Sequence, residues 1–289
     1  MLKQRIITAL VLAPLALGSV FYLPLSLFPF FAAAVTLLGA WEWGAFLPNK
    51  DQPQTKLYRV IFTISLSILM AAFLMLVPIN HIWNAGQLHP IYHAALFIAA
   101  IWWAISMLLV FLYPKASNFW SCSEFYKGLF GQLTLIPFWI GLIALRSYGY
   151  QSDPMLGGVL IVSVFLIVWG ADVGAYFVGR SIGKRKLMPN VSPGKTLEGM
   201  LGGLVTAMLA IFITKSYFYN IEILPLLVLV FITALVSAFG DLSESMLKRN
   251  SDIKDSGTIL PGHGGILDRI DSLTAAIPVF ALGYLFLVA

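Results

Sequence analysis

The sequence contains little cysteine and little charge, and both shortages limit what the chain can be. Cys122 is the only cysteine, which excludes an internal disulfide and a multi-cysteine metal site. Charged residues make up 11% of the chain, against about 25% in soluble domains, so an ordinary soluble globule is excluded. No long basic stripe is present, which argues against a nucleic-acid partner despite the net charge of +5.

Apolar residues dominate instead, at 59% of the chain. Apolar runs of roughly 17 to 25 residues recur, which is the length that a helix needs to cross a bilayer. We predict an all-α, polytopic membrane protein with about nine transmembrane helices. The fifth and eighth runs are short, and a merged or re-entrant pair would change this number. The nine runs cover Ile6–Tyr22, Leu25–Leu47, Val60–Val77, Ile91–Leu112, Leu129–Leu145, Leu156–Val178, Leu197–Thr214, Ile223–Phe239 and Ser272–Val288.

The placement of positive charge gives the predicted orientation. With a cytoplasmic N-terminus, nine spans place all lysines and arginines except Arg146 and Lys215 on the cytoplasmic side. Such an asymmetry is a strong positive-inside signal. We therefore predict a multi-pass protein of a bacterial-type cytoplasmic (inner) membrane, with its C-terminus outside. The two polar loops, 180–196 and 241–271, both fall on the cytoplasmic side.

The chain shows no soluble domain and no convincing internal repeat, which argues against transporter folds built from duplicated halves. We predict one integral-membrane domain over 1–289, with 1–150 mainly a scaffold and 156–289 carrying the site. Glu42 is the polar exception in the first half. It either satisfies a partner within the bundle or lies at the interface with its flanking tryptophans, and we favour the interfacial structural role. Asp172 lies near the end of an apolar run, where an ionisable group usually faces a cavity or a partner. It is a candidate site residue, with a structural ion pair as the alternative.

Residues 241–271 combine chemistry that the rest of the chain lacks. This stretch holds six of the thirteen acidic residues, together with a Pro-Gly-His-Gly-Gly turn. Glycines let backbone N–H groups approach phosphate oxygens, cations neutralise these oxygens, and carboxylates hold a hard divalent ion. The pattern predicts a metal-assisted phosphate site. The candidate substrate-binding residues here are Ser245, Arg249, Lys254, Asp255, His263, Gly264, Gly265 and Arg269.

The spacing of the carboxylates suggests how they meet. Asp241, Ser245 and Lys248 share one face if the eighth helix continues through them. Asp268 and Asp271 lie three residues apart at the entry to the ninth helix. We predict Asp241, Asp268, Asp271 and Lys248 as the catalytic residues, with the three aspartates as metal ligands. Hard oxygen ligands beside a single nearby histidine fit Mg²⁺ better than zinc, and a second, monovalent cation is compatible with them.

The Ser-Pro-Gly-Lys-Thr run at 192–196 has a superficial likeness to a phosphate-binding P-loop. It lacks a glycine that the motif requires and does not follow a predicted strand. We expect a loop that caps the seventh helix, with Ser192 or Thr196 at the helix start. Glu198 would favour the helix N-terminus, and Lys195 would reach a phosphate group.

The segment from Ser245 to Asp271 resembles the signature of the phosphatidate cytidylyltransferases, also called CDP-diacylglycerol synthases. That signature reads Ser-x-x-Lys-Arg, four residues, Lys-Asp-x-small and then His-Gly-Gly-x-x-Asp-Arg-x-Asp, and no position departs from it here. The resemblance extends over the chain through the helix count, the N-terminal start and residues 192–198. It implies substrate contacts for Ser192 and Lys195.

The activity implied by this resemblance is transfer of the cytidylyl group of CTP to phosphatidate, giving CDP-diacylglycerol and pyrophosphate. The setting would be phospholipid biosynthesis among membrane lipids, and a homodimer is left open. A CTP-dependent lipid kinase is one alternative, although it would benefit from a base to activate a hydroxyl group. An anion transporter is a second alternative, but it predicts charged groups near the bilayer midplane rather than in one loop.

Overall fold

The computed structural model describes residues 2–48, 55–84, 86–218, 220–262 and 264–288, and it is 75% helical. That share agrees with the predicted all-α class. The α-helices are α1 (Leu2–Tyr22), α2 (Phe28–Trp43), α3 (Thr55–Leu76), α4 (Pro90–Leu112), α5 (Ser117–Trp120), α6 (Glu124–Ser147), α7 (Leu156–Ile182), α8 (Leu197–Ala210), α9 (Ile223–Asn250) and α10 (Leu267–Val288). The short 3-10 helices are η1 (Ile79–His81), η2 (Ile211–Ile213) and η3 (Lys215–Phe218). Two antiparallel hairpins pair β1 (Trp83–Asn84) with β2 (Gln87–Leu88), and β3 (Lys186–Met188) with β4 (Ser192–Thr196).

Six helices in the described ranges are long and apolar enough to cross a membrane, and the protein is therefore a multi-pass membrane protein. These six are α3, α4, α6, α7, α9 and α10. Three shorter apolar helices, Leu10–Tyr22, Phe28–Trp43 and Leu197–Ile213, coincide with the other three predicted runs. Each of the nine apolar runs thus contains a helix.

The helices that contain the fifth and eighth apolar runs, α6 and α9, are longer than those runs indicated. α6 has 24 residues and α9 has 28. Both continue past the apolar sequence, because backbone hydrogen bonding does not stop where the first charged side chain appears. α6 therefore begins at Glu124, before its apolar run, and α9 carries Asp241 and Lys248 on its last turns.

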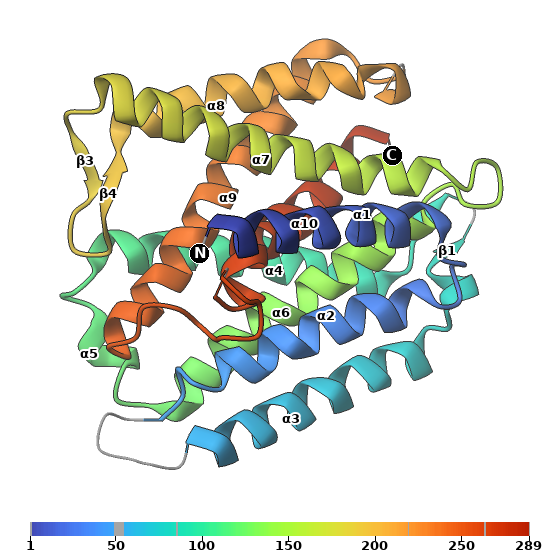
Figure 1. Cartoon of the computed structure of the whole chain (residues 1–289). Coiled ribbons are helices and arrows are strands. Elements are labelled where there is room, and N and C mark those ends of the chain that lie inside the picture. Colours follow the sequence, from blue (N-terminus) through green and yellow to red (C-terminus); the bar gives the residue numbers. More distant parts are fainter. Residues whose placement is uncertain (1, 49–54, 85, 219, 263, 289) are drawn as a thin grey trace.

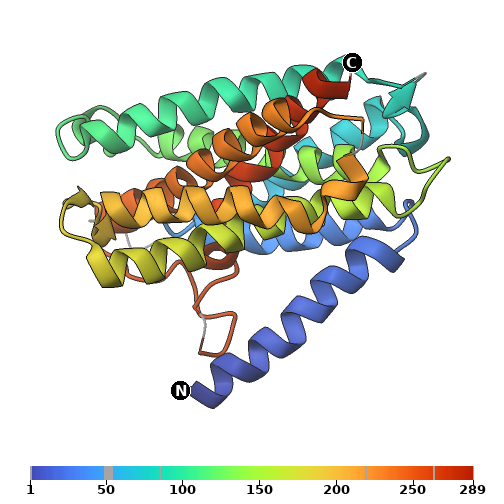
Figure 2. The same cartoon turned by 90° about the horizontal axis from the view of Figure 1, so that it is seen from above.

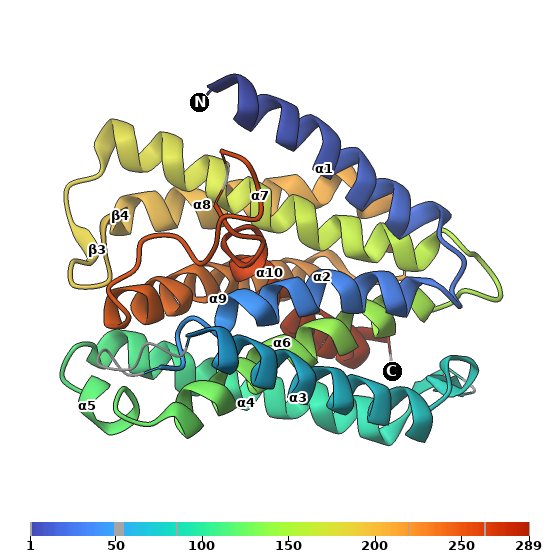
Figure 3. The ribbon, with the colours of Figure 1, turned by 60° about the horizontal axis from the view of Figure 1, so that its bottom comes forward.

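The loops gather at two opposite ends of the molecule (Figure 1). One end holds the β3–β4 hairpin, α5 and the connection between α9 and α10, whereas β1 and the α6–α7 connection lie at the other end (Figures 1 and 3). α1 slants away from the remaining helices towards its N-terminal end (Figure 2). There the Thr8 hydroxyl donates a hydrogen bond to the Pro261 carbonyl at 3.1 Å, so α1 touches the α9–α10 loop.

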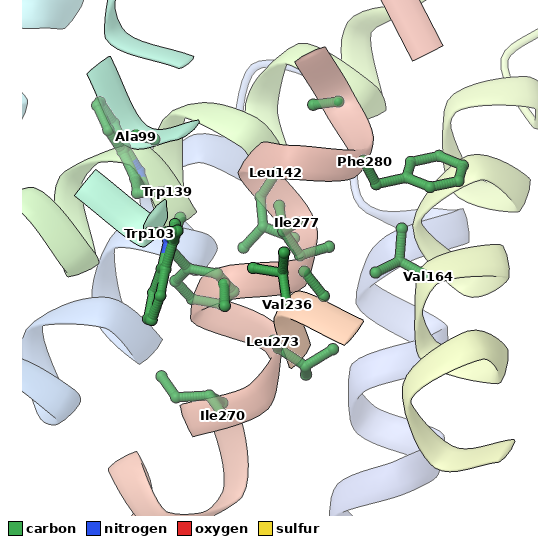
Figure 4. Packing of buried hydrophobic residues seen from close by; sticks show 14 of the residues in the cluster. Ala99, Trp103, Trp139, Leu142, Val164, Val236, Ile270, Leu273, Ile277 and Phe280 are labelled. Carbon is green, nitrogen blue, oxygen red and sulfur yellow. The ribbon is translucent and has the colours of Figure 1, made fainter. Parts of the chain in front are cut away.

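The centre of the bundle is built around α6 and α10. Within their spanning segments 78% and 67% of residues are buried, against 17% for α3, which therefore lies at the periphery. Leu273, Ile277 and Phe280 of α10 lie among apolar side chains of neighbouring helices (Figure 4). Trp139 of α6 is fully buried, and its indole N–H donates to the Pro29 carbonyl at 3.0 Å. This packing fixes α10, which carries Asp268 in its first turn.

α7 and α8 pack against each other at very close range. Gly174 of α7 faces Thr206 and Gly202 of α8, and Gly203 faces the Ala171 backbone. A Cβ atom at either glycine would overlap these neighbours, which is why small residues are needed along this contact. The close pairing brings Asp172 near the hairpin that leads into α8.

Candidate active site

The last turns of α9 carry Asp241, Ser245 and Lys248, as the predicted helical continuation requires. The Ser245 hydroxyl donates to Asp241 Oδ1 at 3.3 Å. Lys248 Nζ lies 2.7 Å from Asp268 Oδ1 and 3.4 Å from Glu244 Oε1. Its ammonium group therefore joins the end of α9 to the start of α10.

Asp268 is held by the loop as well as by Lys248. Its Oδ2 accepts hydrogen bonds from the backbone N–H groups of Ser256, at 3.0 Å, and Gly265, at 2.9 Å. Gly264 has a positive φ of 83°, a conformation that a glycine adopts without strain. The turn at Gly264 directs the N–H group of Gly265 towards the Asp268 carboxylate. The glycines of the signature therefore serve the placement of an aspartate.

Lys195 connects the two polar loops. Its Nζ lies 2.5 Å from Asp241 Oδ2, so β4 contacts the end of α9. Asp172 of α7 is near enough to interact electrostatically with both Lys195 and Asp241. Asp172 and Lys195 also line a cavity of about 420 Å³, together with Tyr176 and Arg180. The arrangement brings two predicted site residues from different segments to one cavity wall.

The segment that leads into α8 is a hairpin rather than an irregular loop. Of the two predicted helix starts, Thr196 is the cap, since its hydroxyl oxygen accepts from the Gly199 N–H at 3.1 Å. Glu198 accepts from the N–H groups of Lys184 and Arg185, each at 3.1 Å, and from the Arg185 side chain at 2.9 Å. These bonds fix the hairpin that presents Lys195.

Several predicted phosphate contacts lie away from this point. Arg249 donates through Nε to the Val191 carbonyl at 3.2 Å, so it attaches α9 to the hairpin. Lys254 and Asp255 line a different cavity of about 920 Å³, with Arg59 on its wall. The predicted basic residues therefore face at least two regions.

Four further candidates complete the predicted set. Asp271 lies one turn after Asp268, and its Oδ1 accepts from the Ser272 N–H at 2.6 Å. Arg269 lies in the first turn of α10. Ser192 is in β4, opposite Met188. His263 lies outside the residues that the structure describes.

Glu244 was missed by the sequence interpretation. It is 3% exposed, and apart from its ion pair with Lys248 no hydrogen-bond donor of the described chain reaches either carboxylate oxygen. It interacts electrostatically with Asp271 and Asp268. Its position three residues after Asp241 and four before Lys248 places it near the same helix face, which is the signal that could have identified it.

The favoured interpretation of Glu42 as an interfacial residue is wrong, and the alternative, a partner within the bundle, is confirmed. Its side chain is 1% exposed. Its Oε2 accepts from the Leu267 N–H at 2.8 Å and from the Ser256 hydroxyl at 3.3 Å. A buried carboxylate needs such partners, and here the signature loop provides them. Ser256, which the sequence did not single out, contacts both Glu42 and Asp268.

The site offers the oxygen ligands that Mg²⁺ prefers, from Asp241, Glu244, Asp268 and Asp271. The two buried Glu244 oxygens without a hydrogen-bond donor are what a nearby cation would satisfy. No group of three or more His, Cys, Asp or Glu residues in the described chain is already arranged as metal ligands. Lysine ammonium groups instead pair with Asp241 and Asp268. The carboxylate oxygens therefore fit Mg²⁺ as ligands, and binding of Mg²⁺ would replace some of these lysine contacts.

Fold and site together define a class, a multi-pass helical membrane protein whose carboxylates and lysines meet where two helices end. Residues 3–287 match the model of the Cytidylyltransferase family, and the chain belongs to that family. The chain is 44% identical over 292 residues to the phosphatidate cytidylyltransferase of Haemophilus influenzae, covering 99% of both. It is 46% identical over 283 residues to that of Pseudomonas aeruginosa, covering 97% of this chain and 96% of the relative. The Bacillus subtilis protein of the same name is 44% identical over 153 residues, 51% of this chain and 55% of its own length.

Proposed function

We propose that this protein is a phosphatidate cytidylyltransferase, a nucleotidyltransferase that forms CDP-diacylglycerol and pyrophosphate from CTP and phosphatidate for phospholipid biosynthesis. The observation that carries the proposal is the near-full-length similarity to two relatives that bear this name, at 44% and 46% identity. The lysine–carboxylate cluster is consistent with it, because the reaction joins two phosphate-containing substrates.

The chemistry requires alignment and charge neutralisation more than a strong base. The second pKa of a phosphate monoester is about 6, so phosphatidate is already largely an anionic nucleophile at neutral pH. A phosphatidate oxygen forms a bond to the α-phosphorus of CTP, and the α–β anhydride bond breaks with its electron pair leaving on pyrophosphate. Lys195 and Lys248 would offset the repulsion between the two polyanions.

Mg²⁺ is the proposed cofactor, held by Asp241, Asp268 and Asp271 with Glu244 beside them. When bound, the ion would neutralise charge on the triphosphate and the departing pyrophosphate. The Glu244 oxygens accept no hydrogen bond from the described chain and have Lys248 as their ion-pair partner, which supports a cation in this region. A second, monovalent cation is compatible with the same cluster. The lysines that now pair with the aspartates would then be free to contact phosphate oxygens.

The lipid phosphate is proposed to enter the cavity of about 420 Å³ beside α7 and α8. Tyr176 on its wall is 57% exposed, and the neighbouring Phe177 on the same helix is 63% exposed. An apolar approach that ends at Lys195 and Asp172 suits a lipid whose charged head must reach Asp241. Ser245, Arg249, Lys254 and the 264–265 turn remain proposed substrate contacts, and so do Ser192, Asp255 and Arg269.

We further propose nine membrane crossings in a bacterial-type cytoplasmic membrane, with α1, α2 and α8 added to the six long helices and the N-terminus inside. Arg59, Lys127 and Lys195 lie at the same end as the site, as the positive-inside rule requires of a cytoplasmic face. Residues 1–289 would form one domain, with a scaffold over 1–150 and the site over 156–289. A homodimer stays a prediction, which the mass of the purified protein would test.

Radiolabelled CTP tests the reaction directly. Purified protein in detergent with phosphatidate should transfer label from α-labelled CTP to the lipid, identified as CDP-diacylglycerol by chromatography. With γ-labelled CTP the label should leave as pyrophosphate. Label from the γ position in the lipid would instead identify a kinase, and no labelled lipid with either substrate would refute both enzyme assignments.

A further inference from the structure

Glu42 lies in the last turn of α2, far from the signature in sequence but against it in space. Its side chain is 1% exposed and accepts hydrogen bonds from the loop that precedes α10 and from the start of α10. The Leu267 N–H belongs to the first turn of α10, where no helical carbonyl is available to accept it. Glu42 Oε2 accepts this bond at 2.8 Å and therefore caps the helix that carries Asp268.

Ser256 is shared between Glu42 and Asp268. Its hydroxyl donates to Glu42 Oε2 at 3.3 Å, while its backbone N–H donates to Asp268 Oδ2 at 3.0 Å. Ser256 is 2% exposed, so both bonds lie away from water. The two carboxylates thus hold one residue between them, and a shift of Glu42 would move a donor of Asp268.

Two glycines of the signature make room for the Glu42 carboxylate. A Cβ atom on Gly257 would overlap Glu42 Oε1, and a Cβ atom on Gly265 would overlap Ser256 Oγ and Glu42 Oε2. Gly265 also donates its N–H to Asp268 at 2.9 Å. The loop therefore closes around Glu42 at the same residues that it uses to bind Asp268.

The end of α2 is itself firmly attached. The indole N–H of Trp43 donates to the Lys127 carbonyl of α6 at 3.0 Å. The guanidinium of Arg59 lies 5.8 Å from the centre of the Trp41 ring, which joins α2 to α3. The end of α2 that carries Glu42 is therefore held in place by its contacts with α6 and α3.

We propose that Glu42 is a positioning residue of the active site, which fixes the α9–α10 loop and the start of α10 so that Asp268 meets Lys248. Its catalytic consequence rests on the proposed cytidylyltransferase function, whereas its effect on the loop does not. The scaffold half of the chain thereby contributes directly to the geometry of the site. Glu42 touches the loop and the helix start, and it acts on the reaction through Asp268.

Hydrogen–deuterium exchange of the intact protein tests the loop effect without any assay of activity. Glu42→Gln keeps the side-chain volume but removes the charge and one acceptor oxygen. We expect amides in 255–268 to exchange at least tenfold faster in this variant. Glu222→Gln, the same change at the exposed start of α9, is the matched control and should exchange like the unaltered protein. Unchanged exchange in 255–268 would overturn the proposal.

Ser256→Ala is a second, milder variant that removes the hydroxyl but keeps the N–H bond to Asp268. It should also speed exchange in 255–268, and it keeps the test open if Glu42→Gln cannot be purified. The double variant should lower the free energy of opening the loop, as measured by exchange, by less than the sum of the two single effects. The reason is that both changes remove the same hydrogen-bonded link. Fully additive effects would overturn the shared-link argument.

Kinetics with CTP and phosphatidate separate positioning from binding. Glu42→Gln should lower kcat at least tenfold, with the KM values for both substrates changed less than threefold. Unchanged kcat with raised KM would overturn the positioning role. So would a loss of kcat that merely follows the fraction of folded protein, so that kcat recovers when a lower assay temperature restores folding. If the unaltered protein makes no CDP-diacylglycerol, the proposed function fails, and the exchange data still decide whether Glu42 holds the loop.

Discussion

At the scale of single residues, the site is a network of opposite charges in which Asp241 and Asp268 each contact more than one donor. Asp241 accepts from Ser245 and pairs with Lys195, whereas Asp268 pairs with Lys248 and two backbone N–H groups. Removing either carboxylate charge takes an ion-pair partner from a partly buried lysine, Lys195 or Lys248. The effect of each substitution should therefore exceed that of an exposed ion pair.

Asp268→Asn and Asp241→Asn should each lower the turnover of CDP-diacylglycerol synthesis by at least about a hundredfold. That loss corresponds to about 2.7 kcal/mol of activation free energy. Asparagine keeps the size of aspartate but removes the charge proposed to bind Mg²⁺, and it replaces one acceptor oxygen by a donor. Initial rates over a range of Mg²⁺ concentrations measure the effect.

Lys56→Gln is the control for these substitutions, because Lys56 is exposed on α3, in the other half of the chain. It should lose little activity. A well-folded Asp268→Asn protein with near-normal turnover at ordinary Mg²⁺ would remove the metal from the proposed mechanism. Elution profiles in detergent would establish that each variant is folded.

At the scale of elements, local spacing could predict what lies within one helix, but not which distant elements meet. The shared face of Asp241, Ser245 and Lys248 follows from a helical period, and the structure confirms it. Glu42 meets Ser256 and Leu267 across 214 and 225 residues, a separation for which a single sequence gives no pairing signal. The tryptophans on either side of Glu42 favoured a position at the membrane interface. The carboxylate is buried instead, because hydrogen bonds from the loop offset the cost of its desolvation.

The β3–β4 hairpin shows the same limit. The capping chemistry of the segment was predictable, since Thr196 and Glu198 are suitable residues for a helix start. The pairing of β3 with β4 was not, because the strands are short, at three and five residues. Lys195 reaches Asp241 only because this hairpin folds back along the end of α9.

The cap of α8 gives a stability prediction for this element. Thr196→Ala should lower the free energy of unfolding by about 1 kcal/mol, because the Gly199 N–H loses its acceptor. Thr196→Ser keeps a hydroxyl at this position and should retain most of the stability. Thermal unfolding of the purified protein in detergent measures both variants. Equal midpoints for Thr196→Ala and the unaltered protein would mean that the cap contributes nothing.

At the scale of the whole molecule, positive charge and site chemistry share one end of the bundle. Arg59, Lys127, Lys195 and Lys248 belong to four different helices or strands. Arg59 and Lys127 line a cavity with Lys254 of the α9–α10 loop, whereas Lys195 and Lys248 pair with Asp241 and Asp268 of the site. Arg146 marks the opposite end, where its guanidinium donates to the Pro154 carbonyl of the α6–α7 connection and to the Phe21 and Leu23 carbonyls at the end of α1. A soluble, highly charged nucleotide can reach only a site that opens to the compartment that contains it. The proposed orientation therefore follows from the substrate as well as from the charges.

Labelling of cysteine in intact cells tests that orientation with a probe that the chain already carries. Cys122 is exposed and lies just before α6, at the end of the bundle that holds the site. A membrane-impermeant thiol reagent added outside should leave Cys122 unlabelled until the membrane is permeabilised. In a Cys122→Ser background, Gln151→Cys on the exposed α6–α7 connection should be labelled from outside. Labelling of Cys122 in sealed cells would reverse the orientation, and CTP would then need a route to the site from the other side of the membrane.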